Sequence, residues 1–329
     1  MSASGTENLN SDERSFDAPR VSVLMTVYNA ALYLRESIDS VLAQSFKDWE
    51  LIAVDDGSTD ASPSILTDYS DHRVRVFPLP KNIGRTPALR YAFDQARGDY
   101  IAVLDNDDIS HPERLARQVE FLDEQPDVAI VGSWVQYIDE HGIIIAEFSP
   151  PTDQGELQDC LGWTNPIMHS SAMFRRSLAL AVGGYPEHLV YSQDFGLTLA
   201  LARHYKIAMI DDFLCQLRIL PASMTRSRKQ QAVIARDRLV TFQYAVDFLP
   251  LSKKARRLNR HAIALAKSKL GFATLGTGSV LAGMKTIFHG IAHDPSVLWK
   301  NGPVSRFLGK SGDFLKNSRA SSCPLRTRR

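Results

Sequence analysis

The sequence lacks any long apolar run, and only three of its 329 residues are cysteines. No stretch reaches the roughly 18 consecutive apolar residues that indicate a membrane-spanning helix, and the N-terminus has no apolar core of a signal peptide. Cys160, Cys215 and Cys323 are odd in number and far apart, without the close spacing of a metal site. These absences favour a cytoplasmic protein and give no support for secretion or membrane insertion.

Acidic residues are scarce in the last third of the chain. Residues 218–329 hold 22 of the 38 lysines and arginines but only 4 of the 37 aspartates and glutamates, although the whole chain has a formal net charge of +1. Polybasic helical segments bind anionic membrane surfaces. We therefore expect residues 221–329 to form a basic helical region, either peripheral on the inner face of a membrane or packed on the remaining protein as a solvated appendage. No nucleic acid is expected, because aromatic residues do not interleave with the basic ones.

The remaining chain alternates between strand and helix patterns. Residues 1–20 are polar and predict a flexible arm. From residue 21 to about 220, apolar β-branched segments alternate with helical patterns of 10 to 15 residues, which predicts a doubly wound sheet with parallel strands. Further on, the pattern predicts a hairpin that adds antiparallel strands, a strand over 167–174 and two closing strands over 207–210 and 213–219.

Each of the first four predicted strands ends in a polar loop. Because the carboxyl ends of parallel strands meet at one edge of a sheet, these loops should gather along a single rim, where open α/β sheets bind ligands. The loops are Thr26 to Asn29, Asp55 to Asp60, Asn82 to Arg85, and Asp105 to Asp108.

The stretch from Tyr100 to Asp108 joins a predicted buried strand to a dense acidic cluster. Its apolar residues lead directly into Asp105, Asp107 and Asp108. Carboxylates this close together repel one another unless a cation or a set of donors neutralises them, and oxygen ligands of this kind suit Mg²⁺ or Mn²⁺. On these residues alone two interpretations stay open: a divalent-metal site, or a solvated acidic turn before the helix predicted to begin near Pro112.

Four motifs that follow one another in a fixed order favour the divalent-metal site over the solvated acidic turn. They are VSVLMTVYN at 21–29, LIAVDDGSTD at 51–60, NIGRTPALRYAFDQARGDYIAVLDNDD at 82–108 and GGYPEHLVYSQDFGLTLALA at 183–202. Over residues 21–218 the chain resembles the inverting family 2 glycosyltransferases of GT-A fold. The resemblance implies a Rossmann-like mixed α/β sheet flanked by helices, with the basic region as a C-terminal helical appendage.

The resemblance also implies a reaction and its partners. The family moves a sugar from a nucleotide-diphosphate donor, most commonly a UDP-sugar, to an acceptor hydroxyl with inversion at the anomeric carbon. The implied acceptor is a glycan or a lipid-linked molecule in cell-surface polysaccharide or glycolipid assembly. A non-catalytic protein of the same fold that binds a nucleotide or a glycan is the alternative. A nucleotidyltransferase is disfavoured, because Thr26 to Asn29 leads into a helix without a glycine-rich loop.

Matched motif by motif, the resemblance assigns the donor site to strand ends. Asp105-Asn106-Asp107 matches the Asp-x-Asp signature, in which Asp105 faces the ribose and Asp107 holds the Mg²⁺ or Mn²⁺ that bridges the two phosphates. A solvated loop arginine remains the alternative for Arg85. The residues implied to bind the nucleotide sugar are Thr26, Tyr28, Asp55, Asp56, Arg85, Asp105 and Asn106.

The implied catalytic base is Asp194, which follows the glycine-rich loop at 183–184. An acceptor hydroxyl is a poor nucleophile at neutral pH, and a carboxylate that accepts its proton assists the attack. The chain has Gln193-Asp194 where the family often has Glu-Asp, and an ordinary helix-capping aspartate is the alternative. Gln193, His169 and Trp163 are further candidates for contacts with sugar or acceptor. The alternative for His169 is a partly buried histidine bonded to the backbone, and the alternative for Trp163 is core packing.

Overall fold

The computed structural model describes residues 18–220, 228–275, 280–294 and 325–327, and the predicted arm over 1–20 lies almost entirely outside them. Parallel strands β1 (Val21–Val27), β2 (Trp49–Asp55), β3 (Val74–Pro78) and β4 (Tyr100–Val103) occupy one half of the sheet in the order β3-β2-β1-β4. Their carboxyl ends meet at one edge, as Val27 pairs with Asp55. The predicted rim is therefore confirmed.

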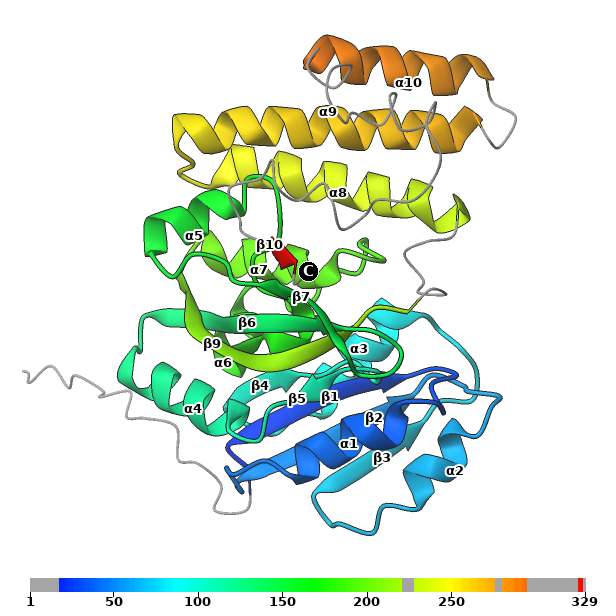
Figure 1. Cartoon of the computed structure of the whole chain (residues 1–329), viewed down its shortest axis with the longest axis vertical. Helices are drawn as coiled ribbons and strands as arrows, with labels where there is room; N and C mark the ends of the chain where they lie inside the picture. The colour runs from blue at the N-terminus through cyan, green and yellow to red at the C-terminus, as the bar shows by residue number, and fades with distance from the viewer. Residues whose placement is uncertain (1–17, 221–227, 276–279, 295–324, 328–329) are drawn as a thin grey trace, which may run out of the picture.

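Helices cover both faces of this half (Figure 1). Side chains of β1 alternate between two apolar cores: Val23 belongs to the core under α1 (Leu34–Leu42) and α4 (Arg114–Glu124), and Leu24 to the core under α3 (Arg85–Gln95). This alternation follows from the two-residue repeat of a strand. Helix α2 (Ser62–Thr67) connects β2 to β3.

The other half of the sheet is mixed. The predicted hairpin is confirmed as β6 (Val128–Ile138) and β7 (Ile144–Phe148), and β8 (Met173–Arg175) lies antiparallel between β6 and β4. The longest strand, β9 (Lys206–Arg218), pairs in parallel with β6 and also with the short β5 (Ile109–Ser110).

In this half one strand prediction is wrong, and another is confirmed except for the break it placed between two strands. Residues 169–171 form a 3₁₀ helix, η1 (His169–Ser171), instead of part of a strand over 167–174, and this turn lets the Ser170 hydroxyl accept a hydrogen bond from the Asp105 amide at 3.1 Å. The two predicted closing strands are the single strand β9, whose register against β6 shifts near Trp134. A bulge bends a strand without ending it.

Helices α5 (Gln154–Cys160), α6 (Arg176–Ala181) and α7 (Gln193–Ala202) follow along the chain, and α8 (Arg228–Phe248), α9 (Lys253–Leu275) and α10 (Val280–His293) stack beyond the sheet, with α8 nearest to it (Figure 1). Strand β10 (Leu325–Thr327) pairs with β7. Phe242, Leu251 and Ile263 share one apolar core with Leu24 of the sheet. None of the described helices is both long and apolar enough to span a bilayer.

The basic helices are thus packed against the sheet and its flanking helices. The buried amide of Asn259 in α9 donates hydrogen bonds to the backbone oxygens of Gly162 and Phe242, both at 2.7 Å. Backbone acceptors on two different elements fix the position of α9 against the segment after α5. The domain boundary predicted near residue 220 falls next to residues 221–227, which lie outside the described part, and it stays a prediction.

Candidate functional site

The two aspartates after β2 hold the loops at the rim. The Asp55 carboxylate accepts a hydrogen bond from the Ser58 amide at 3.0 Å. The Asp56 carboxylate accepts from the Ile83 amide at 2.7 Å and from the Gly84 amide at 3.0 Å. Both aspartates are nearly inaccessible to solvent, at 4% and 3%. In this structure the Asp56 carboxylate therefore fixes the loop that leads into α3 and Arg85.

A second contact ties β1 to the acidic loop. The side-chain amide of Asn106 donates to the backbone oxygen of Thr26 at 2.7 Å. Tyr28 lies just beyond, with 47% of its surface exposed, and Asn29 adopts a left-handed conformation with φ of 51° while its side-chain oxygen accepts from the Thr59 amide at 2.8 Å. The predicted residues Thr26, Tyr28 and Asn106 are thus adjacent, and the Tyr28 ring is open to a ligand.

Arg85, the first residue of α3, is the central cation of the rim. Its Nη2 donates to both carboxylate oxygens of Asp105, at 2.9 and 2.7 Å, and lies 3.4 Å from Nδ1 of His169. The negative charge of Asp105 raises the pKa of Arg85 against the opposing effect of burial, and the charges of Asp194 and Asp107 add to the increase. Arg85 is therefore a fixed part of the site, and the solvated-loop alternative is wrong.

Asp105 and His169 complete this group. Burial by itself would raise the pKa of Asp105, but the charge of Arg85 and the contact with His169 hold that pKa well below its ordinary value. The other ring nitrogen of His169 lies 3.3 Å from the hydroxyl of Tyr185, whose ring meets the imidazole edge-on. Asp105 is thus an ionised carboxylate that is already neutralised by Arg85.

Gln193 connects this group to α7. In the orientation of its amide that satisfies both neighbours, its nitrogen donates to the Val190 oxygen at 3.2 Å and its oxygen accepts from Nε of Arg85 at 3.1 Å. Gln193 is only 2% exposed. The residue that departs from the family's usual glutamate therefore lies behind Arg85 and orients its guanidinium.

Asp107 differs from its neighbours because its carboxylate forms no hydrogen bond or ion pair with another described residue. Burial and the charge of Asp105 raise its pKa to about 6, and the charges of Arg85 and Arg218 offset this increase only in part. A divalent cation beside this carboxylate would relieve both effects. The described residues contain no cluster of three His, Cys, Asp or Glu side chains able to hold an ion. A cation at Asp107 would therefore draw its remaining ligands from phosphate oxygens and water.

Asp108 is buried behind the acidic loop and braces it. Its carboxylate accepts a short hydrogen bond from the Ser170 hydroxyl and one from the Arg218 amide at 2.8 Å. Burial, followed by the charges of Asp107 and Asp105, raises the pKa of Asp108 well above its ordinary value. The Arg218 guanidinium donates to the Asp107 backbone oxygen at 3.0 Å. Arg218 belongs to none of the four sequence motifs, and its role depends on the long-range position of β9.

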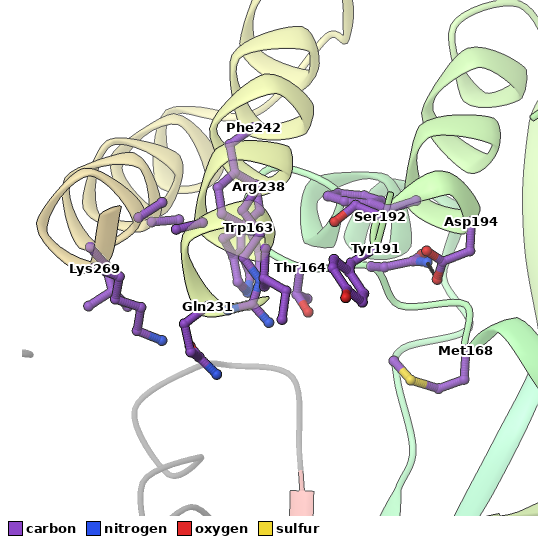
Figure 2. Close-up of a pocket in the computed structure, with 17 residues that line it drawn as sticks. Trp163, Thr164, Met168, Tyr191, Ser192, Asp194, Gln231, Arg238, Phe242 and Lys269 are labelled. Atoms are coloured by element: carbon purple, nitrogen blue, oxygen red, sulfur yellow. Dashed lines mark hydrogen bonds between the residues drawn. The ribbon is translucent and has the colours of Figure 1, made fainter. Parts of the chain in front are cut away.

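Asp194 lies in the first turn of α7, on the wall of a cavity of about 350 Å³. The Asn165 side-chain amide donates to its carboxylate at 3.1 Å. Trp163 and Tyr191 also line this cavity, and Trp163 packs against the main apolar core as well. Figure 2 shows Tyr191 and Asp194 on one side and Arg238, Gln231 and Lys269 on the other. The far wall is built by α8 and α9, which the sequence motifs do not include.

The loop before Asp194 is held from two sides. The Thr86 hydroxyl of α3 donates to the Leu189 oxygen at 2.7 Å. The carboxylate of Asp237 in α8 accepts from the Val190 amide at 2.8 Å and the Tyr191 amide at 2.7 Å. Asp237 is buried. The sequence analysis missed Asp237 and Asn165, because a single polar residue within a helix or loop carries no local signal of a distant partner.

Comparison with known proteins identifies related sequences. Residues 22–182 match the family model described as glycosyl transferase family 2. The uncharacterized glycosyltransferase MJ1057 of Methanocaldococcus jannaschii is 35% identical over 209 residues, which cover 62% of this chain and 72% of that protein. TuaG of Bacillus subtilis, a putative teichuronic acid biosynthesis glycosyltransferase, is 42% identical over 109 residues, which cover 32% of this chain and 43% of TuaG.

Solved structures confirm the predicted fold class. S. aureus TarS 1–349 in complex with UDP-GlcNAc superposes with a TM-score of 0.58 at 17% identity, over 94% of this chain and 96% of that one. The mannosyltransferase PcManGT of Pyrobaculum calidifontis, in complex with GDP-Man and Mn²⁺, gives a TM-score of 0.55 at 21% identity, over 89% of this chain and 79% of that one. The fold is therefore GT-A-like, a mixed α/β sheet flanked by helices.

Proposed function

This chain belongs to glycosyl transferase family 2, and we propose that it transfers a sugar from a UDP-sugar to an acceptor hydroxyl with inversion of the anomeric carbon. The observation that carries the proposal is the juxtaposition of two carboxylates in unlike settings. The Asp107 carboxylate is paired with no other described residue at the rim, and Asp194 lies on the wall of the cavity. The charges of both carboxylates act on Arg85, which supports neighbouring positions for the donor and the acceptor.

In this mechanism the chain's own residues hold the donor and receive a proton. Tyr28 and the loops fixed by Asp55 and Asp56 surround the nucleotide. Asp194 accepts the proton of the acceptor hydroxyl while the hydroxyl oxygen attacks the anomeric carbon from the side opposite the departing diphosphate. A single displacement of this kind inverts the configuration at that carbon. The Asn165 amide keeps the Asp194 carboxylate oriented.

Asp107 would hold Mg²⁺ or Mn²⁺, which neutralises the charge that develops on the departing diphosphate. Its raised pKa fits that role, as does a carboxylate that forms no hydrogen bond or ion pair with another of the residues the structure describes. The Mn²⁺ and GDP-Man in the PcManGT complex and the UDP-GlcNAc in the TarS complex support the choice of ligands. We propose Asp105, paired with Arg85, for the ribose side of the donor.

We further propose that the product belongs to a cell-surface polysaccharide or glycolipid. The name of TuaG, which refers to teichuronic acid biosynthesis, supports this assignment. The basic side chains at the start of α9 support peripheral contact with an anionic membrane, because Lys253, Lys254, Arg256 and Arg257 are all exposed. Such contact would bring the cavity to a lipid-linked or growing glycan acceptor.

Release of nucleoside diphosphate from a panel of nucleotide sugars tests the proposal, with Mn²⁺ or with EDTA. We expect release from a UDP-sugar, its loss in EDTA and in Asp107→Asn, and a fall of at least about a hundredfold in Asp194→Asn. Donor binding should survive in Asp194→Asn. Binding of a UDP-sugar without release, whatever acceptor is added, would indicate the non-catalytic alternative. Absence of binding to every nucleotide sugar would contradict the proposal.

A further inference from the structure

The cavity beside Asp194 has an unusual charge pattern. Among the 17 residues that line it, Asp194 is the only acidic one, while Arg238 and Lys269 are basic. Aromatic side chains, including Trp163 and Tyr191, form much of the remaining wall. The lining does not include Arg85 or Asp107 of the donor rim. The two basic residues are therefore placed on the acceptor side of the site.

Helices α8 and α9 each turn one face toward the cavity. In both helices the lining residues recur at intervals of three or four positions, which is the spacing of a single helical face. In α8 they are Gln231, Ile234, Ala235, Arg238 and Phe242, and in α9 they are Ala262, Leu265, Ala266 and Lys269. Arg238 and Lys269 are the charged members of these two faces, and Figure 2 shows both on the wall formed by the two helices.

Arg238 has no anionic partner within the described ranges of the chain. Its guanidinium forms no hydrogen bond or ion pair with these residues, and Arg238 is an exposed residue that lines the cavity. Surrounding protein lowers the pKa of Arg238, and the charge of Asp194 acts in the opposite direction, so the two groups influence each other. The neighbouring Asp237 anchors this turn of α8 to the loop before Asp194. The turn of α8 that carries Arg238 is thus anchored on the cavity wall that faces the proposed base (Figure 2).

We propose that this cavity binds an acceptor that carries an anionic group, either a phosphate or a carboxylate, and that Arg238 selects it. This inference rests on the proposed function, because it takes Asp194 as the group that meets the acceptor hydroxyl. Arg238 presents donors in a planar fork that matches phosphate and carboxylate oxygens, and Lys269 adds a second positive charge. Trp163 and Tyr191 offer faces for the sugar ring or another apolar part of the acceptor.

Binding of matched sugars to the full-length protein tests this inference without requiring turnover. Ligand-observed NMR titration measures the affinity for methyl glycosides of glucose, galactose and N-acetylglucosamine. Each neutral glycoside is compared with its 6-phosphate and with the uronic acid that has a carboxylate at carbon 6. We expect one charged form to bind at least about tenfold more tightly than its neutral parent, since a hydrogen bond to a charged group is stronger than one between neutral groups. The phosphate and carboxylate series distinguish the two sources of negative charge.

Arg238→Gln should abolish this preference, and Arg236→Gln should retain it. Arg236 lies two positions away on α8, is exposed and does not line the cavity. Equal affinity for neutral and charged forms, no binding of any form, or an unchanged preference in Arg238→Gln would each overturn the inference. A weakened affinity of Arg238→Gln for the nucleotide-sugar donor, with acceptor preference retained, would also overturn it. Failure of donor release with the charge preference intact would count against the proposed function alone.

Discussion

Asp237 of α8 accepts a hydrogen bond from the backbone amide of Tyr191 at 2.7 Å, three residues before Asp194. The same carboxylate oxygen accepts from the Val190 amide at 2.8 Å. A helix from the basic C-terminal region therefore holds the loop that delivers the proposed base. This contact explains how residues outside the family motifs can influence catalysis in this protein.

Replacing Asp237 tests that influence. Asp237→Ala leaves two amides without their acceptor, so we expect a loss of about 1–3 kcal/mol in the free energy of unfolding and a fall in kcat of about tenfold or more, because the loop before Asp194 loosens. Asp237→Asn can present one amide oxygen to both N–H groups and should restore most of the activity. Urea unfolding and steady-state kinetics measure the two effects. Full activity in Asp237→Ala would show that the hydrogen bonds of Asp237 do not position the loop.

Arg85 should be irreplaceable by lysine. Its guanidinium reaches both oxygens of Asp105 through Nη2 and the Gln193 amide oxygen through Nε, and one ammonium group cannot reproduce this geometry. We expect Arg85→Lys to lower kcat/KM for the donor by about tenfold to a hundredfold, since a misplaced Asp105 also disturbs Asp107. Lys81→Arg, at an exposed position of the preceding loop, is the control. Kinetics of Arg85→Lys indistinguishable from those of the wild type would contradict this account.

The buried carboxylate of Glu50 should make the stability of the protein depend on pH. This carboxylate accepts hydrogen bonds from Ser22 at 2.7 Å and from the guanidinium groups of Arg75 and Arg97, the closest contact of each at 2.7 Å. Burial raises the pKa of Glu50, but these hydrogen bonds outweigh it and lower the pKa below its ordinary value. A depressed folded-state pKa stabilises the protein above the pKa of the unfolded chain, about 4.3, and that stabilisation is lost as pH falls through the folded value.

The matching experiment compares the wild type with Glu50→Gln by urea unfolding at neutral pH and near pH 3, well below the ordinary glutamate pKa of about 4.3. We expect the variant to be less stable by about 1–3 kcal/mol at neutral pH, with the difference shrinking as the wild-type carboxylate becomes protonated. A difference that stays constant across this range would show that the charge of Glu50 contributes nothing.

Two cysteines should be inert in the native protein. Cys160 and Cys215 are buried, and burial raises the pKa of Cys215 to about 11. The Cys215 thiol donates to the Ser170 backbone oxygen at 3.0 Å. The thiolate is the reactive form. In a Cys323→Ser variant, neither Cys160 nor Cys215 should therefore react with a disulfide reagent at about pH 8 until the protein is unfolded. Fast reaction in the native state would contradict the described packing. Cys323 lies outside the described residues.

The proposed membrane contact predicts a dependence on the first turns of α9. Replacing Lys253, Lys254 and Arg257 by glutamine removes three exposed charges, each contributing about 1 kcal/mol near an anionic bilayer. In a sedimentation assay, the affinity for anionic vesicles should therefore be about a hundredfold lower in this triple variant than in the wild type, and neither protein should bind neutral vesicles. Arg256 is left unchanged because its side chain donates to backbone oxygens of Leu251 and Val246. Equal sedimentation of wild type and variant would refute the contact.

The sequence and the structure agree most closely where the information is local. The strand from Tyr100 and the loop of Asp105, Asn106 and Asp107 follow from an apolar run and the acidic residues directly after it. The prediction of a strand over 167–174 was wrong because the turn at η1 depends on Ser170 bonding to Asp105 and Asp108, 65 and 62 residues away. The local pattern of apolar residues does not indicate a partner so far away in the sequence.

The sequence by itself determined the alternation of strands and helices, the acidic rim and the family, because each depends on neighbouring residues along the chain. Only the tertiary structure decided that Arg85 pairs directly with Asp105 and not with Asp107, and that α8 and α9 form a wall of the cavity at Asp194. The physical reason is that charge, burial and cavity shape depend on groups that approach in space. Asp237 and Tyr191 are 46 residues apart in sequence, and folding brings them into one hydrogen bond.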